Sequence, residues 1–197
     1  MPDIDLVPLQ AQAMQPSTST LEVYFEFDTM DDGMNHAVVS GSFNGASWDP
    51  VTYNAPLVPA TMSALTLGDN ATTSEAYGPL SFAVGHLEVL DIVLRNGDSG
   101  KHPLYDLPLR ISTQRTDGYL YSHLHGHQMQ IVNYASDYTS DDPSLNPPIN
   151  ESQPNPMRRD TVLSPAGSAY TFRVTMDNPG VWFFHCVFAS VLARGSC

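Results

Sequence analysis

Basic residues are scarce in this sequence. Lys and Arg together number 8 against 21 Asp and Glu, which gives a formal net charge of −13 at pH 7. Proteins that bind nucleic acid gain much of their affinity from Lys and Arg contacts with phosphate. The shortage of cations therefore argues against a nucleic-acid partner, and the acidic surface fits solubility or the attraction of metal cations.

Long apolar runs and cysteines are also few. No apolar run approaches the roughly 20 residues that a membrane helix needs, so we expect no membrane span. The first residues, MPDID, have neither the basic start nor the apolar stretch of a signal peptide.

Cys186 and Cys197 are the two cysteines, which excludes a disulfide framework. The Asn-x-Ser/Thr triplets at Asn70 and Asn150 would accept glycans only in a secreted protein.

Helical periodicity is missing as well, and β-strand patterns take its place. Hydrophobic residues make up 42% of the 197 residues, enough for one folded domain. From Leu21 to Asp28, apolar side chains alternate with polar ones, as in a half-buried strand. Similar short runs, separated by Gly, Pro, Asn and Asp, lie at 37–39, 80–84, 87–94, 128–132, 169–175 and 181–185. The pattern predicts an all-β antiparallel sandwich or barrel.

Three segments of the chain lack strand patterning. Residues 6–20 are mostly polar, contain proline and lack periodicity, which predicts that residues 1–20 are a linker from a preceding domain and that the β domain covers residues 21–197. Residues 104–122 and 136–156 are predicted to be loops, the second being dense in Asp, Ser, Asn and Pro.

Histidines are concentrated in one part of the chain. Of the 7 histidines, four lie in residues 102–127, including the His123-Leu124-His125 triplet. On a strand, this spacing of two places both imidazoles on one face, so that two nitrogen ligands reach neighbouring metal positions. A lone histidine is more often structural or exposed, and we expect His36 and His86 to be exposed.

An apolar segment, GVWFFHC at 180–186, ends in adjacent His185 and Cys186. Neighbouring side chains on a strand point in opposite directions, so these two residues would serve two sites joined by a few covalent bonds. Such a connection suits electron transfer. A thiolate with two histidines is the ligand set of blue copper, and a histidine-rich pocket suits a copper cluster that handles O₂. The alternative for Cys186 is an inert buried thiol.

Taken together, these motifs resemble those of the third, C-terminal cupredoxin domain of fungal multicopper oxidases, especially the iron-uptake ferroxidases. The resemblance covers nearly the whole chain and rests on DSGKHP at 98–103, HLHGH at 123–127, PMRRDT at 156–161 and DNPG leading to His-Cys at 177–186. It implies a cupredoxin-like (plastocyanin-like) Greek-key β-sandwich or barrel with loop insertions. It also implies type 1, type 2 and type 3 copper as cofactors.

The family's HPxHxH and HCHxxxH patterns assign a role to each matching residue. By this resemblance His102 and Cys186 would ligate type 1 copper, His123 type 2 copper, and His125 and His185 type 3 copper. His127 is not a ligand in the family pattern. In the ferroxidases an acidic residue four positions before the type 1 histidine is associated with Fe(II) oxidation. Here it is Asp98, a carboxylate suited to a hard cation; the alternative is a turn-forming Asp before Ser-Gly.

The resemblance further implies the reaction, the partners and the location. The family oxidises a reductant, here Fe(II) or a small phenolic or organic molecule, and reduces O₂ to water. Ferroxidases of the family act with an iron permease, and relatives work at the cell surface or outside the cell. Two other functions remain open on the sequence alone: a single-copper electron-transfer or binding module, and a metal-free structural β-domain.

The sequence departs from the family pattern in two places. Nineteen residues, 104–122, stand where the family has one, and Val187 and Val191 stand where it has a type 3 and a type 1 histidine. Both departures are explained by the hypothesis that 104–122 and 187–197 are translated introns, which would make the first an insertion and leave the domain truncated at its C-terminus. With ligands missing and His102 displaced, we expect the chain alone to be an incompetent oxidase.

Overall fold

The structure is a computed structural model that describes residues 3–31, 37–46, 81–98 and 120–186. Within these ranges nearly all regular structure is β-strand, as predicted, with one short 3₁₀ turn, η1 (Asp3–Asp5). The strands are β1 (Ser19–Asp31), β2 (Ala37–Phe43), β3 (Val89–Asn96), β4 (Leu120–Leu124), β5 (Met129–Ala135), β6 (Arg158–Arg159), β7 (Thr161–Ser164), β8 (Ala169–Thr175) and β9 (Phe184–Cys186).

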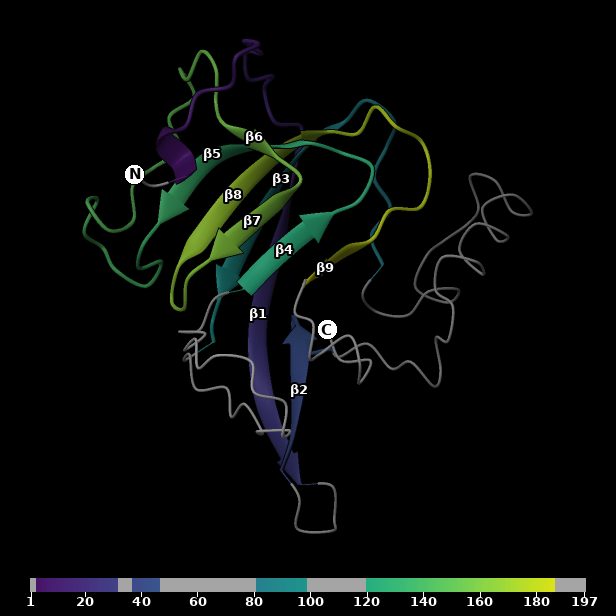
Figure 1. Cartoon of the computed structure of the whole chain (residues 1–197), viewed down its shortest axis with the longest axis vertical. Helices are drawn as coiled ribbons and strands as arrows, with labels where there is room; N and C mark the ends of the chain where they lie inside the picture. Colours follow the sequence, from purple (N-terminus) through teal and green to yellow (C-terminus); the bar gives the residue numbers. More distant parts are fainter. Residues whose placement is uncertain (1–2, 32–36, 47–80, 99–119, 187–197) are drawn as a thin grey trace, which may run out of the picture.

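The strands form two sheets. The larger has the order β2-β1-β3-β8-β5-β6, and the smaller has the order β7-β4-β9. β1 and β3 pair in parallel, while the other pairs are antiparallel. In Figure 1 the smaller sheet crosses in front of the larger one. The result is a two-layer β-sandwich.

The core lies between these two sheets. Alternation along β8 directs Tyr170, Phe172 and Val174 to one face, where they join the main hydrophobic cluster. Phe172 is fully buried, and its ring stacks on Tyr170 with centroids 5.7 Å apart. The smaller sheet contributes Leu124 and Val162 to the same cluster. This shared core fixes β4, and therefore the histidines at its end, against the rigid larger sheet.

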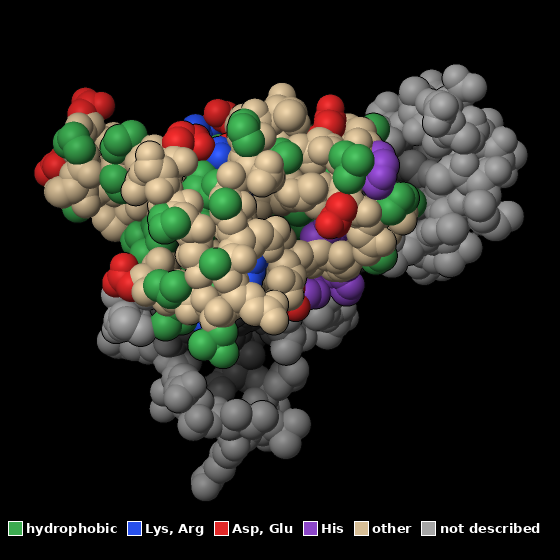
Figure 2. Space-filling model, turned by 90° about the horizontal axis from the view of Figure 1, so that it is seen from above, with side chains coloured by type: hydrophobic (Ala, Val, Ile, Leu, Met, Phe, Trp, Pro, Cys, Tyr) green, Lys and Arg blue, Asp and Glu red, His purple; other side chains and the backbone are tan. Residues whose placement is uncertain are grey.

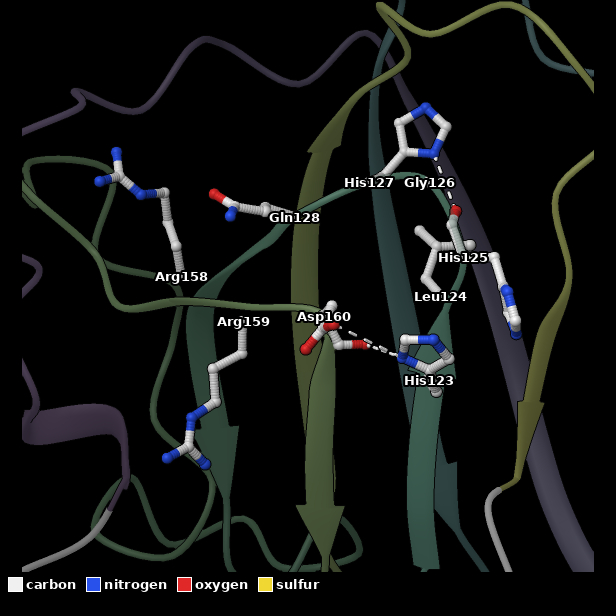
Figure 3. Close-up of a pocket in the computed structure, with 9 residues that line it drawn as sticks. All are labelled: His123, Leu124, His125, Gly126, His127, Gln128, Arg158, Arg159 and Asp160. Carbon is white, nitrogen blue, oxygen red and sulfur yellow. Dashed lines mark hydrogen bonds and ion pairs between the residues drawn. The ribbon is translucent and has the colours of Figure 1, made fainter.

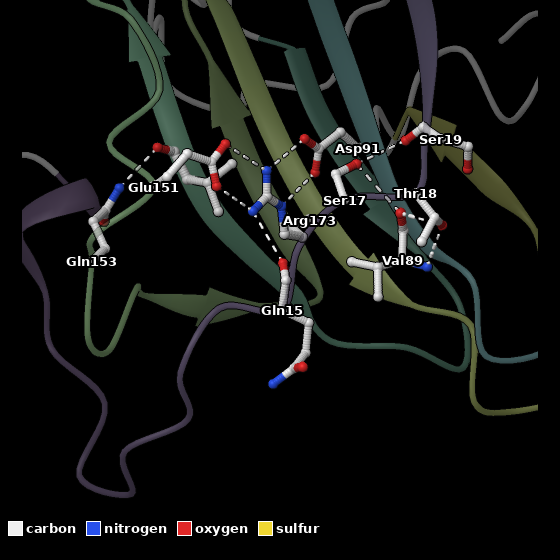
Figure 4. A network of polar contacts seen from close by, with 10 residues as sticks. Gln15, Ser17, Thr18, Ser19, Val89, Asp91, Glu151, Gln153 and Arg173 are labelled. Carbon is white, nitrogen blue, oxygen red and sulfur yellow. Dashed lines mark hydrogen bonds and ion pairs between the residues drawn. The ribbon is translucent and has the colours of Figure 1, made fainter.

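The opposite face of the larger sheet carries a buried ion pair. Arg173 lies directly across from Asp91 in the β3–β8 register, and its Nε and Nη2 donate to the two carboxylate oxygens at 2.7 and 2.8 Å. Nη1 also donates to Glu151 at 2.7 Å and to the Gln15 carbonyl at 3.1 Å (Figure 4). Hydrogen bonding to this guanidinium keeps the pKa of Glu151 below its ordinary value. One side chain thus joins two strands, a loop and the N-terminal segment.

The N-terminal segment, predicted to be a linker, packs along the domain through hydrogen bonds from side chains of the domain. Asn155 Nδ2 donates to the Pro8 carbonyl at 2.8 Å, and Gln130 Nε2 donates to the Gln12 carbonyl at 3.0 Å. Arg158 Nη1 donates to Gln12 Oε1 at 2.7 Å. These contacts hold the segment against the β domain up to β1.

Several boundaries differ from the sequence prediction. The described part of the predicted strand 80–84 forms no strand, and Phe82 is 50% exposed there. The predicted strand 181–185 is regular only from Phe184. Residues 120–122, predicted to lie in a loop, belong to β4, whereas 136–156 is a loop as predicted. β6 and β7 were not predicted. His36, Asn70 and residues 104–119 and 187–197 lie outside the described residues.

In the part of the chain that the structure describes, no helix has the length and apolar character needed to cross a membrane.

Candidate metal centre

Three histidines are brought together by the smaller sheet. His123 lies near the end of β4, and its register partner on β9 is His185. His125 follows in the turn after β4, where its backbone N–H donates to the Phe183 carbonyl at 2.9 Å. The sequence prediction placed His125 on the strand itself. The turn nevertheless keeps His125 on the same side as His123, because their ring centroids are 4.5 Å apart.

The ring nitrogens of two of these histidines point at each other. Nε2 of His125 lies 2.8 Å from Nε2 of His185, and their ring centroids are 5.0 Å apart. The His123 ring stands at 87° to that of His185, with centroids 5.6 Å apart. In Figure 2 histidine side chains reach the surface near one another. The three imidazoles therefore form one cluster, the histidine cluster: His123, His125 and His185.

His123 is oriented by its neighbour strand. Its Nδ1 lies 2.9 Å from the Asp160 carbonyl and 2.9 Å from Thr161 Oγ1, as the dashed lines to Asp160 in Figure 3 indicate. A carbonyl only accepts, so Nδ1 carries the proton and Nε2 of the neutral ring keeps its lone pair. Metal-binding histidines are typically oriented in this way, by a backbone carbonyl at the other nitrogen.

A pocket opens beside the cluster. It is lined by residues from the end of β4, the following turn and the β6 region: His123, Leu124, His125, Gly126, His127, Gln128, Arg158, Arg159 and Asp160 (Figure 3). Its polar lining gives the histidine cluster access to solvent and to ions.

The cluster changes the acidity of His125. Although His125 is exposed, local desolvation, followed by the nearby His123 and His185 rings, lowers its pKa below the ordinary value of 6.5. Each cause penalises the charged ring. His125 therefore remains neutral, and so able to bind a metal ion, at a lower pH than a free histidine.

This shift predicts a pH dependence of stability in the metal-free chain. Below about pH 6.5 the unfolded chain takes up a proton at His125 that the folded chain resists, so unfolding becomes easier as the pH falls. Urea unfolding from about pH 7.5 to about pH 5.5 is expected to show a larger loss of stability for the unmodified chain than for H125Q. Equal losses in the two proteins would contradict the shift.

The donor chemistry of the cluster fits a transition metal. Imidazole nitrogen suits copper, zinc, iron and nickel. Two nitrogens at about 2.0 Å from one ion must lie within roughly 4 Å of each other, as the His125–His185 pair does. No group of three His, Cys, Asp or Glu side chains among the described residues is arranged around a single ion. The cluster therefore offers a pair of ligands for one ion and a neighbouring ligand, His123, for another.

The other predicted site residues are placed less completely. His102 lies outside the described residues, and Cys186 on β9 is described by its backbone, which pairs with Ser122 on β4. Asp98 is buried just after β3, and its N–H donates to Asn96 Oδ1 at 3.1 Å. The described wall of the pocket does not include Asp98.

Sequence reasoning missed the residues that support the cluster. His127, treated as a non-ligand, is buried and lies 3.2 Å from the His125 carbonyl through Nδ1. Trp182, expected to lie within a core strand, instead covers Gly126. The sequence did contain one signal for this turn, the glycine between His125 and His127. Gly126 has a φ of +72°, which residues other than glycine rarely adopt.

Comparison with known proteins gives consistent matches. The sequence model of the family described as "Multicopper oxidase" matches residues 110–196. The chain is 42% identical over 186 residues to the "Iron multicopper oxidase fer1" of Mycosarcoma maydis, a match that covers 93% of this chain and 25% of that protein. It is 34% identical over 194 residues to the "Iron transport multicopper oxidase FET3" of Saccharomyces cerevisiae, covering 93% of this chain and 26% of that protein.

Solved structures agree with these matches. The crystal structure of Fet3p, described as a multicopper oxidase that functions in iron import, superposes with a TM-score of 0.71 at 30% identity, covering 100% of this chain and 34% of that one. A laccase from B. aclada matches with a TM-score of 0.53 at 20% identity, over 92% of this chain and 27% of that one, which supports the fold alone. The chain spans about a quarter of the length of the curated relatives it matches. It belongs to the multicopper oxidase family and has the family's cupredoxin fold.

Proposed function

We propose that this chain is the copper-binding domain through which a multicopper oxidase of the ferroxidase type oxidises Fe(II) and reduces O₂ to water. The convergence of the histidine cluster carries the proposal: His125 and His185, 60 residues apart in sequence, place their Nε2 atoms 2.8 Å apart. The names of the relatives refer to iron, and one of them to iron transport, which favours Fe(II) over a phenolic reductant.

Each residue has a role in this proposal. His125 and His185 would bind copper in the cluster, and His123, whose Nδ1 is held by the Asp160 carbonyl, would present Nε2 to a neighbouring copper. His102 and Cys186 would hold a separate, type 1 copper. Bound copper would supply the one-electron chemistry, in which four Fe(II) ions become Fe(III) while O₂ and four protons become two waters. The covalent link from Cys186 to His185 would connect the two sites.

Asp98 would bind the iron substrate. A carboxylate prefers a hard cation and stabilises Fe(III) relative to Fe(II), so it would favour loss of the electron. Further cluster ligands would come from the rest of the oxidase, and for this reason we expect the isolated chain to bind copper without consuming oxygen. By the same resemblance, the complete protein would work with an iron permease at the cell surface.

Copper titration of the full chain against a competing chelator tests the proposal. The unmodified chain is expected to bind copper, and H125A is expected to bind it about ten- to a hundredfold more weakly, because one of the paired nitrogens is lost. The matched control is H86A, which removes an exposed histidine from a turn outside the cluster and should leave the affinity unchanged. A chain that binds no copper, or equal losses in H125A and H86A, would reject the proposal.

A further inference from the structure

The turn that carries His125 is attached to the segment that leads into β9 by a closed set of contacts. Asn178 Nδ2 donates to the Gly126 carbonyl at 3.0 Å, and the Trp182 indole N–H donates to the Asn178 carbonyl at 2.7 Å. The Trp182 ring in turn lies directly over Gly126. These three residues, Gly126, Asn178 and Trp182, are called the tryptophan clamp.

Trp182 is 37% exposed, but its indole lies close to two glycines. A Cβ added at Gly126 would lie 2.4 Å from Cε3 of Trp182, closer than real Cβ contacts come. A Cβ at Gly180 would lie 3.2 Å from Cε2 and Cζ2 of the same indole. The indole therefore contacts two glycine backbones, and it joins the turn to the segment 178–183 alongside the bond from the His125 N–H to the Phe183 carbonyl.

Two members of the histidine cluster lie next to the parts of the chain that the clamp joins. His125 immediately precedes Gly126, and His185 follows Trp182 by three residues. The His127 ring packs edge-on against Trp182, with centroids 5.6 Å apart at 88°, while its Nδ1 lies 3.2 Å from the His125 carbonyl. His127 therefore contacts both the Trp182 indole and the His125 backbone, so a shift of the indole would also displace His125.

From these contacts we infer that Trp182 is a positioning residue, which sets the distance between Nε2 of His125 and Nε2 of His185 through Gly126 and Asn178. The inference deepens the proposed function, on which its consequence for copper rests. Trp182 itself lies outside the described lining of the pocket and would not touch the metal. Loss of the indole would let the turn shift and would separate the paired nitrogens.

The first test needs no metal. Two Nε2 atoms 2.8 Å apart need a proton on one of them. In the metal-free full chain, labelled with ¹⁵N at histidine, we therefore expect an N–H···N bond between His125 and His185 and a ¹⁵N–¹⁵N coupling across it. W182L is expected to lose this coupling. W182F, which keeps a ring over Gly126 but loses the donor to Asn178, is expected to weaken it. Retention of the full coupling in W182L, with native circular dichroism, would overturn the inference.

A matched glycine pair separates positioning from backbone strain. Gly126 and Gly167 have φ values of +72° and +71°, but a Cβ at Gly167 meets nothing within 4 Å. G126A and G167A therefore carry the same conformational penalty, whereas only G126A displaces Trp182. We expect the coupling to be lost in G126A and kept in G167A. If both variants keep it or both lose it, the clamp does not set the distance.

Copper affinity provides the second readout. W182L and G126A are expected to bind copper about ten- to a hundredfold more weakly than the unmodified chain, and G167A to bind it equally. In the double variant G126A/W182V the added Cβ no longer clashes with an indole, but the indole is also missing. The free energy of unfolding should therefore rise above that of G126A, whereas the copper affinity should stay low. Recovery of affinity would overturn the inference. A failure of the unmodified chain to bind copper would instead reject the proposed function, and the coupling would still decide the role of Trp182.

Discussion

Replacement of Arg173 by Met is expected to lower the free energy of unfolding by about 3–5 kcal/mol. The substitution preserves much of the side-chain volume but removes the guanidinium that donates to both oxygens of Asp91. Asp91 is 5% exposed, so its carboxylate would remain buried without its cationic partner. Urea unfolding measures the loss as a lower midpoint with an unchanged slope.

A second arginine of the larger sheet supplies the control. Arg95 pairs with Glu22 at 2.7 Å, but their side chains are 36% and 62% exposed. Water screens such a pair, so R95M should change stability by no more than about 1 kcal/mol. The double variant D91L/R173M should recover part of the loss, since it leaves no buried charge. If R173M loses no more than R95M, the buried pair is not a major determinant of stability.

Replacement of Phe172 by Ala is expected to destabilise the fold to a similar extent, by about 3–5 kcal/mol. The phenyl ring is 0% exposed at the centre of the core between the sheets, and its removal would leave a cavity that the neighbouring strands cannot fill. The same change at Phe82, which is 50% exposed, should alter stability by less than about 0.5 kcal/mol. Equal midpoints for F172A and F82A in urea would contradict this description of the core.

Alternation of apolar and polar residues was sufficient to predict the main strands. β1 and β8 have clear period-two patterns, and β8 was predicted with its observed bounds. Apolar and polar residues alternate along these strands because one face of each strand packs on the core. β7 has a buried Ser164 at a core-facing position, so its alternation is hidden and it was not predicted. The predicted strand at 80–84 is apolar in composition, but its Phe82 lies largely in solvent.

Long-range polar contacts could not be predicted from local patterns. Arg173 and Asp91 are 82 residues apart in sequence, and only the β3–β8 register makes them neighbours. The sole local sign of this ion pair was that Arg173 and Asp91 each stand in an otherwise apolar run. The tryptophan clamp is equally non-local, since it joins Gly126 to Asn178 across 52 residues. A charged residue within an apolar segment indicates that a buried partner is needed, but only the fold determines which residue that partner is.

The pairing of His123 with His125 was predicted from their spacing of two residues, whereas His185 was added to them only by the family resemblance. His123 and His125 share a side in the structure, although His125 achieves this in a turn, and β9 brings His185 beside them. What the spacing could not predict is how each ring is held. The bond from His123 Nδ1 to the Asp160 carbonyl depends on the pairing of β4 with β7, an unpredicted strand.

The most direct test of the account is electron paramagnetic resonance of the full chain, ¹⁵N-labelled at histidine and loaded with half an equivalent of Cu(II). Coupling of the copper to imidazole nitrogens of His125 and His185 is expected, with one fewer nitrogen in H125A and in H185A. H86A should give the spectrum of the unmodified chain. A copper signal that shows no histidine nitrogen, or that H125A and H185A leave unchanged, would contradict the assignment of the histidine cluster as a copper site.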